Sequence, residues 1–83
     1  MDTLKALGKN IKFHRTQLGL TQEDLANLSG VYRSHLAGIE TGNVNPSVKT
    51  VEKIAKAMNV AVADLFHEEA SWASEQFQWL WIS

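Results

Sequence analysis

The side chains best able to make specific contacts cluster at residues 32–35, where a phenol, a guanidinium, a hydroxyl and an imidazole follow one another. Most of them point away from Leu36 and Ile39, which fit the apolar face of a helix beginning at residue 32. Polar groups on the open face of a helix suit recognition of a partner. The four residues are Tyr32, Arg33, Ser34 and His35.

Catalytic and metal-binding patterns are missing from the sequence. It has no nucleophile–base constellation, no paired carboxylate site and no phosphate-binding loop, so we do not expect an enzyme. There is no cysteine, which excludes disulfide and thiol chemistry. The three histidines, at positions 14, 35 and 67, lack metal-ligand spacing. We therefore expect neither a metal nor another cofactor.

Length and charge narrow the class of protein further. Eighty-three residues suit one domain. No signal sequence or apolar run of about 20 residues is present, so we expect a cytoplasmic protein without a membrane partner. The net charge is −1, but residues 1–63 hold all eight Lys and Arg against five Asp and Glu, and residues 64–83 hold four carboxylates. A basic body with an acidic tail is compatible with DNA binding.

Helical spacing and turn residues predict the elements that position the cluster. The first helix spans residues 3–18 and ends at Gly19, with His14 at the edge of its apolar stripe. That stripe consists of Leu4, Leu7, Ile11 and Leu18.

The second and third helices span residues 21–29 and 32–40. Thr21 and Asp24 approach a capping box, and Gly30 suits the positive φ just past a helix end. The second helix should bury Leu25 and Leu28, with the small Ala26 at a close helix crossing and Val31 packed at the turn.

A loop at residues 41–46 precedes the fourth helix, for which Ser47 and Thr50 are both plausible caps and Asn59 a stop. Residues 60–66 should form a short fifth helix. The buried side of the fourth helix is expected to hold Val48, Val51, Ile54, Ala55 and Met58, opposite exposed Lys49, Lys53 and Lys56. The fifth helix should close the core with Val62, Leu65 and Phe66.

Residues 21–40 closely resemble the helix-turn-helix of the Cro/CI-type (Xre-like) repressors. The matching positions are Gln22, Leu25, Ala26, Gly30, Leu36 and Ile39. The resemblance continues through residues 40–42, 45–47, 54–58 and 64–66, and covers roughly residues 4–67. It implies an all-α, five-helix lambda-repressor-like DNA-binding domain at residues 1–67, followed by an aromatic tail at residues 68–83.

The resemblance also implies roles for individual residues. The start of a recognition helix faces base edges in the major groove, which assigns base readout to Tyr32, Arg33, Ser34, His35 and Gly38. Arg33 is the strongest candidate, because its fork matches the O6 and N7 acceptors of guanine. Gly38 departs from the usual polar or bulky residue. Phosphate contacts are expected from Gln22, Asn43, Asn45 and Ser47. For Gln22, helix capping, bracing of Arg33 and base readout remain alternatives.

In this family, an arginine near the end of the first helix commonly pairs with a glutamate that closes the third. Arg15 and Glu40 match these positions. An arginine–carboxylate pair can be bidentate and fix geometry as well as charge. We therefore expect a structural ion pair here.

The tail holds three tryptophans within ten residues, and periodicity does not decide between helix and strand. So many aromatic side chains must pack on their own domain, on a second subunit or on a partner protein. The leading hypothesis is a sequence-specific transcriptional regulator that binds double-stranded DNA as a homodimer on an inverted repeat. It resembles phage-type repressors and, less closely, restriction–modification controllers. The alternative is an antitoxin or adaptor that binds another protein through residues Trp72–Ser83, with DNA binding secondary.

Overall fold

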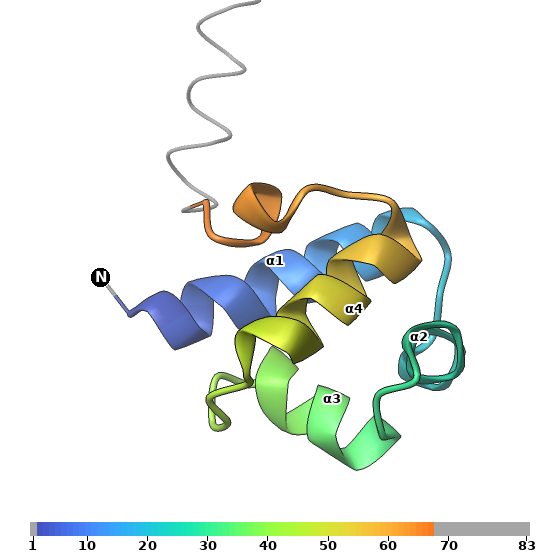
Figure 1. Cartoon of the computed structure of the whole chain (residues 1–83), viewed down its shortest axis with the longest axis horizontal. Helices are drawn as coiled ribbons and strands as arrows, with labels where there is room; N and C mark the ends of the chain where they lie inside the picture. The colour runs from blue at the N-terminus through green and yellow to red at the C-terminus, as the bar shows by residue number, and fades with distance from the viewer. Residues whose placement is uncertain (1, 68–83) are drawn as a thin grey trace, which may run out of the picture.

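The computed structural model describes residues 2–67, which form four α-helices and one short 3₁₀ helix (Figure 1). No strand occurs among these residues, so the all-α prediction is confirmed for this part of the chain. The expected fifth helix is a single 3₁₀ segment. The predictions for the tail lie outside the described residues. The elements are α1 (Thr3–Gln17), α2 (Gln22–Ser29), α3 (Arg33–Glu40), α4 (Val48–Met58) and η1 (Val62–Leu65).

Side-chain caps fix where the helices begin. Thr21 Oγ1 accepts a hydrogen bond from the Asp24 N–H at 3.0 Å, and Asp24 Oδ2 accepts one from the Thr21 N–H at 2.9 Å, which completes the predicted capping box. Ser47 caps α4 by accepting from the Thr50 N–H at 3.1 Å. These caps explain why the starts of α2 and α4 lie within one residue of the predicted positions, whereas the predicted fifth helix begins two residues later than expected, at Val62.

Residues in the left-handed α conformation fix where two of the helices end. Gly30 closes α2 with φ 75°, as predicted. Asn59 closes α4 with φ 56°, which makes it the one non-glycine residue of positive φ among the residues described.

In the fold, α1 packs against α3 and α4, α2 packs against α3 and α4, and η1 closes over α1 and α4, with the core between these elements (Figure 1). Its fully buried side chains come from all five elements, so no element is independent of the others. They are Leu7, Ile11, Leu25, Leu36, Ile39, Ile54 and Leu65.

Four side chains that the apolar patterns placed in the core are exposed instead: Leu18, Leu28, Val48 and Phe66. The buried residues of α2 are Leu25 and Ala26, and Leu28 points about 110° away from the direction midway between them, which leaves it 61 % exposed. Val48 is 75 % exposed because it is the first residue of α4 and lies beyond the reach of the core. Leu18 and Phe66 are the residues that follow α1 and η1, where the chain turns away.

Two polar or small residues hold elements together in ways that the patterns did not indicate. Asn10 is buried on α1, and its side-chain nitrogen donates to the carbonyl of Leu65 at 2.9 Å and to that of His67. Gly8 lies against the end of α3, where an added Cβ would come within 2.5 Å of the Ile39 and Glu40 carbonyl oxygens. Asn10 therefore fixes the segment after α4, and Gly8 permits a close approach of α1 to α3.

Candidate nucleic-acid interface

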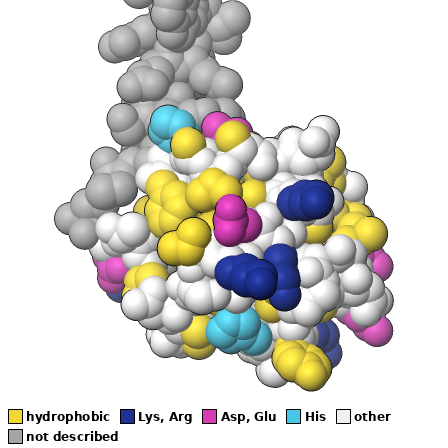
Figure 2. Space-filling view, in the orientation of Figure 1, with side chains coloured by type: hydrophobic (Ala, Val, Ile, Leu, Met, Phe, Trp, Pro, Cys, Tyr) yellow, Lys and Arg dark blue, Asp and Glu magenta, His cyan; other side chains and the backbone are white. Residues whose placement is uncertain are grey.

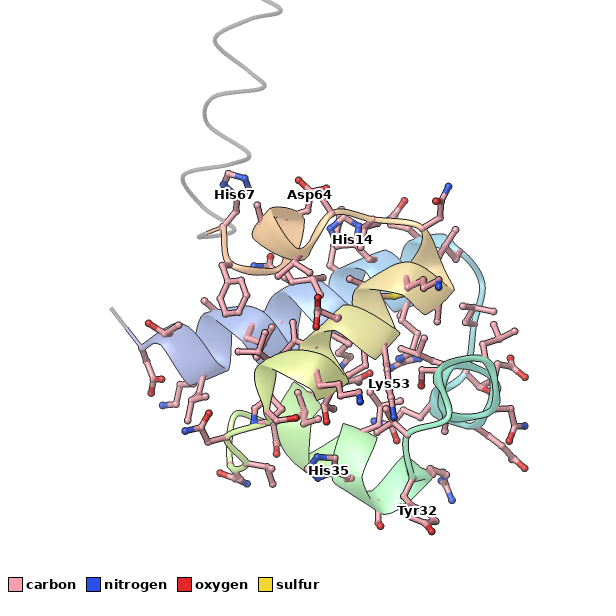
Figure 3. All side chains as sticks on the ribbon, viewed as in Figure 1. His14, Tyr32, His35, Lys53, Asp64 and His67 are labelled. Carbon is pink, nitrogen blue, oxygen red and sulfur yellow. The ribbon has the colours of Figure 1, made fainter. Side chains whose placement is uncertain are left out.

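The start of α3 presents the predicted base-reading cluster to solvent. Tyr32 is 85 % exposed, Arg33 and Ser34 are also exposed, and His35 is half-buried. Figure 3 shows Tyr32 and His35 at the outer edge of the molecule. One turn further along, Leu36 and Ile39 anchor the opposite face of α3 in the core. The helix is thus held rigidly by one face while its first turn remains free to contact a partner.

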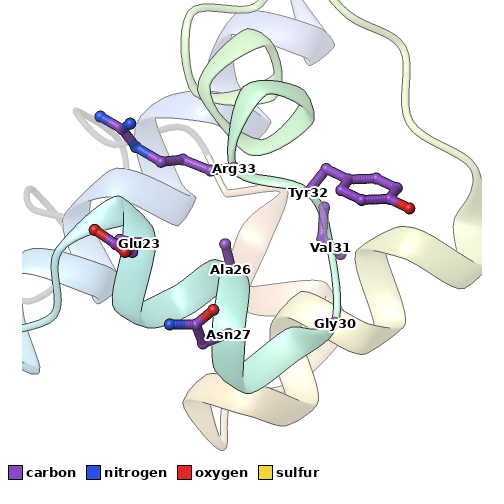
Figure 4. Close-up of a pocket in the computed structure, with 7 residues that line it drawn as sticks. All are labelled: Glu23, Ala26, Asn27, Gly30, Val31, Tyr32 and Arg33. Carbon is purple, nitrogen blue, oxygen red and sulfur yellow. The ribbon is translucent and has the colours of Figure 1, made fainter.

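An open groove of about 420 Å³ runs between α2 and the start of α3. Figure 4 shows Glu23 and Asn27 on the α2 side, and Tyr32 and Arg33 on the α3 side. The Glu23 carboxylate and the Arg33 guanidinium therefore belong to one polar cleft beside the base-reading cluster. Glu23 and Asn27 were not predicted as site residues, because only their position across the turn brings them to this surface.

Gly38 lies on a side of α3 that faces the following loop. A Cβ added there would come 2.6 Å from Val44 Cγ2. The missing side chain therefore allows Val44 to pack against α3. A base contact at Gly38 stays a prediction. What the structure shows is that this glycine allows the loop to pack against α3.

Arg15 and Glu40 form the predicted bidentate ion pair. Arg15 Nε donates to Glu40 Oε2 at 2.7 Å, and Nη2 donates to Oε1 at 3.0 Å. Arg15 Nη1 also donates to the carbonyl of Leu20 at 2.8 Å, which ties the turn after α1 to the same group. The hydrogen bond to Glu40 raises the pKa of Arg15 above its usual value, and the charge of Glu40 adds to the effect. The pair joins α1 to the last residue of α3.

Gln22 joins this network. Its side-chain nitrogen donates to Glu40 Oε1 at 3.1 Å, and the cap of α2 comes from Thr21. The alternative that Gln22 serves as the helix cap is therefore wrong. Gln22 is half-buried, so part of its side chain remains accessible.

The other predicted phosphate ligands lie after α3. Asn43, Asn45 and Ser47 are all exposed. The Asn43 N–H donates to the Gly38 carbonyl at 3.1 Å, which folds the loop back on α3. Asn43, Asn45 and Ser47 thus lie together between α3 and α4. Gln22 lies beside Glu40, the last residue of α3, and is hydrogen-bonded to it.

Positive charge gathers on a neighbouring surface. Lys49, Lys53 and Lys56 are exposed on α4, as predicted. Figure 2 shows Lys and Arg side chains on the face that carries this helix, and Figure 3 shows Lys53 on the same side of the molecule as His35 and Tyr32.

Among residues 2–67 no group of His, Asp and Glu could hold a metal ion. No helix in this range is long and apolar enough to cross a membrane.

The tight turn at Gly30, the rigidly packed α3 and its exposed first turn together define a helix-turn-helix DNA-binding domain. The profile of the HTH_3 helix-turn-helix family matches residues 11–65, and the chain belongs to this family. It is a transcriptional regulator of the Xre-like helix-turn-helix type.

Individual relatives agree with this assignment. The chain is 45 % identical over 56 residues to an HTH-type transcriptional regulator of Methanocaldococcus jannaschii, a match that covers 68 % of this chain and 85 % of that one. It is 37 % identical over 73 residues to the immunity repressor protein of Bacillus phage phi105, covering 88 % of this chain and 51 % of the repressor. The crystal structure of the restriction-modification controller protein C.AhdI from Aeromonas hydrophila matches with a TM-score of 0.74 and 40 % identity, over 76 % of this chain and 96 % of that chain.

Proposed function

We propose that the protein regulates transcription by binding, as a homodimer, to an inverted repeat in double-stranded DNA. The first turn of α3 enters the major groove of each half-site, and Arg33 makes the principal base contact. The observation that supports this most directly is the division of α3 into a buried face at Leu36 and Ile39 and an exposed first turn. A rigid helix with a free first turn is what major-groove readout requires.

Phosphate contacts orient the domain on the duplex. We assign them to Gln22 at the start of α2 and to the exposed loop residues Asn43, Asn45 and Ser47. Gln22 is bonded to Glu40 at the end of α3, and the loop residues directly follow α3, so both groups hold the helix while its first turn meets the bases.

Selection of binding sites from random duplex DNA tests the proposal. The unaltered protein should enrich an inverted repeat, with half-sites about one helical turn apart. Arg33→Ala should relax the preference at one base pair in each half-site, by about 1–3 kcal/mol. Uniform weakening on all sequences would make Arg33 a phosphate ligand, and failure to enrich an inverted repeat would refute the proposal.

Two observations support dimerisation. The excess of Lys and Arg over Asp and Glu in residues 1–63 is small, so one copy should bind DNA weakly and two copies should bind better. In addition, exposed apolar side chains lie on elements that pack together. Val48 lies on α4 and Phe66 directly follows η1, and both side chains are exposed. The aromatic residues of Trp72–Ser83 would add to such an interface.

Sedimentation of the full chain provides the test of dimerisation. Phe66→Asp should shift the protein toward monomer, whereas Leu18→Asp, which alters an exposed leucine after α1, should not. The antitoxin or adaptor alternative would instead be favoured if the chain sediments as a monomer and co-purifies with an equimolar amount of another protein, and if Trp79→Ala/Trp81→Ala abolishes this co-purification.

The relatives narrow the biological setting. The chain is similar to the restriction-modification controller protein C.AhdI and to a phage immunity repressor. We propose a controller-like or repressor-like activity for this chain on that basis.

A further inference from the structure

Glu40 has two partners with different roles. Its Oε2 accepts from Arg15 Nε at 2.7 Å, and its Oε1 accepts both from Arg15 Nη2 at 3.0 Å and from Gln22 Nε2 at 3.1 Å. The Glu40 side chain is 3 % exposed. One buried carboxylate therefore links the last residue of α3 to α1 and to the first residue of α2.

The chemistry of the carboxylate fixes which end of the Gln22 amide faces it. An ionised carboxylate only accepts hydrogen bonds, so the nitrogen of Gln22, and not its oxygen, must face Glu40. An amide nitrogen carries two N–H groups, and the bond to Glu40 uses one of them. The second N–H remains for another acceptor.

The charge of Glu40 would repel an approaching phosphate if it were not compensated. Arg15 compensates it through two parallel hydrogen bonds, and Arg15 is itself held by the Leu20 carbonyl at 2.8 Å. The network therefore presents a neutral, fixed amide donor at the accessible side of Gln22.

We propose that Glu40 is a positioning residue for DNA binding, which holds the Gln22 amide so that its second N–H donates to a backbone phosphate. This inference rests on the proposed DNA-binding function and adds a residue that does not itself touch DNA. A side chain ordered in the free protein loses less conformational entropy on binding than a mobile one. Glu40 thus acts on the fold through Arg15 and on DNA affinity through Gln22.

A double-mutant cycle separates the two roles. Arg15→Met/Glu40→Met replaces the ion pair by apolar side chains of similar length, which often leaves stability nearly unchanged. It also leaves net charge unchanged, so electrostatic attraction to DNA is matched. Gln22→Ala is then made in the unaltered chain and in this double variant. Binding is measured on a random-sequence duplex, because phosphate contacts do not depend on base sequence.

In the unaltered chain, Gln22→Ala should weaken binding at least about tenfold for each subunit that contacts the duplex, as expected for the loss of one hydrogen bond to a charged acceptor. In the Arg15→Met/Glu40→Met chain it should change affinity less than twofold. Because a neutral amide releases no counterion, the slope of log affinity against log salt should stay the same in all four proteins. Asn10→Ala serves as the control, since it weakens the fold away from Gln22 and should leave affinity unchanged while the protein stays folded.

Equal weakening by Gln22→Ala in both backgrounds would overturn the role of Glu40 while leaving DNA binding intact. No binding by the unaltered protein would overturn the proposed function as well. If the double variant does not fold, NMR of the Gln22 side-chain amide in the unaltered protein decides: its two proton signals should shift on addition of DNA, and unmoved signals would overturn the inference.

Discussion

Replacing Gly8 with alanine tests how closely α1 packs against the end of α3. An ideal Cβ at this position comes 2.5 Å from the carbonyl oxygens of both Ile39 and Glu40, and these atoms belong to the backbone of another helix. Neither oxygen can rotate away, and Glu40 is further held by Arg15. The helix must therefore move, and overpacking of this kind costs about 1–3 kcal/mol or more.

Helix propensity acts in the opposite direction, because alanine is favoured over glycine in a helix interior by about 1 kcal/mol. With a steric cost at the upper end of its range, Gly8→Ala should lower the free energy of unfolding by about 2 kcal/mol. For a domain of this size that corresponds to a fall in melting temperature of roughly 10 °C. Urea and thermal denaturation followed by circular dichroism measure both quantities.

Gly38→Ala is the matched control within the same fold. Its added Cβ meets only the side chain of Val44, at 2.6 Å from Cγ2, and a loop side chain can shift. The change in stability should remain within about 1 kcal/mol, because the helix propensity gained offsets the displacement of Val44. The reasoning is refuted if Gly8→Ala is as stable as the unaltered protein, or if both substitutions cost the same.

Three further substitutions test individual interactions. Glu40→Ala leaves Arg15 buried without its partner and should cost about 3 kcal/mol in urea denaturation, and an unchanged midpoint would count against the ion pair. Asn10→Ala removes the donor to the Leu65 carbonyl and should cost about 1–3 kcal/mol by the same assay, and a neutral effect would show that this bond is dispensable. Two hydrogen bonds from the capping threonine, first from its backbone N–H and then from its hydroxyl, lower the pKa of Asp24. The stability that the ionised Asp24 contributes to the fold is therefore complete above the ordinary carboxyl range near pH 4. This contribution disappears as the pH falls through the folded-state pKa. Asp24→Asn should therefore be less stable than the unaltered chain at pH 7, and this difference should shrink as the pH falls below about 4. A difference that stays constant in acid would contradict this cause.

Local signals were sufficient for the boundaries of α2 and α4. Thr21, Gly30, Ser47 and Asn59 act through their own backbone neighbours, so a linear sequence contains the information needed to predict them. The Arg15–Glu40 pair joins residues 25 positions apart, and the resemblance to a family was needed to predict it.

Packing between elements could not be predicted in the same way. Leu28 was expected to be buried because it lies three residues after Leu25. It is exposed, because the short α2 turns Leu25 and Ala26 toward the core instead. The sequence alone did not explain the glycines at positions 8 and 38, and only the approach of Ile39, Glu40 and Val44 shows why a Cβ would be crowded there. Similarly, Gln22 was predicted to contact phosphate, which stays a prediction, and its hydrogen bond to Glu40 appears only once α2 and α3 are in place.

The two ends of α3 differ in how freely they can change. At its first turn, the Arg33 and Ser34 side chains are exposed and make no hydrogen bond to other described residues, so substitutions of these proposed base-reading residues should cost little stability. At its last residue, Glu40 serves Arg15 and Gln22 together, so no substitution there can leave both the fold and the proposed phosphate contact intact. On the proposed mode of DNA binding, a change of operator would therefore come through the start of α3, while Glu40 would be retained at its end.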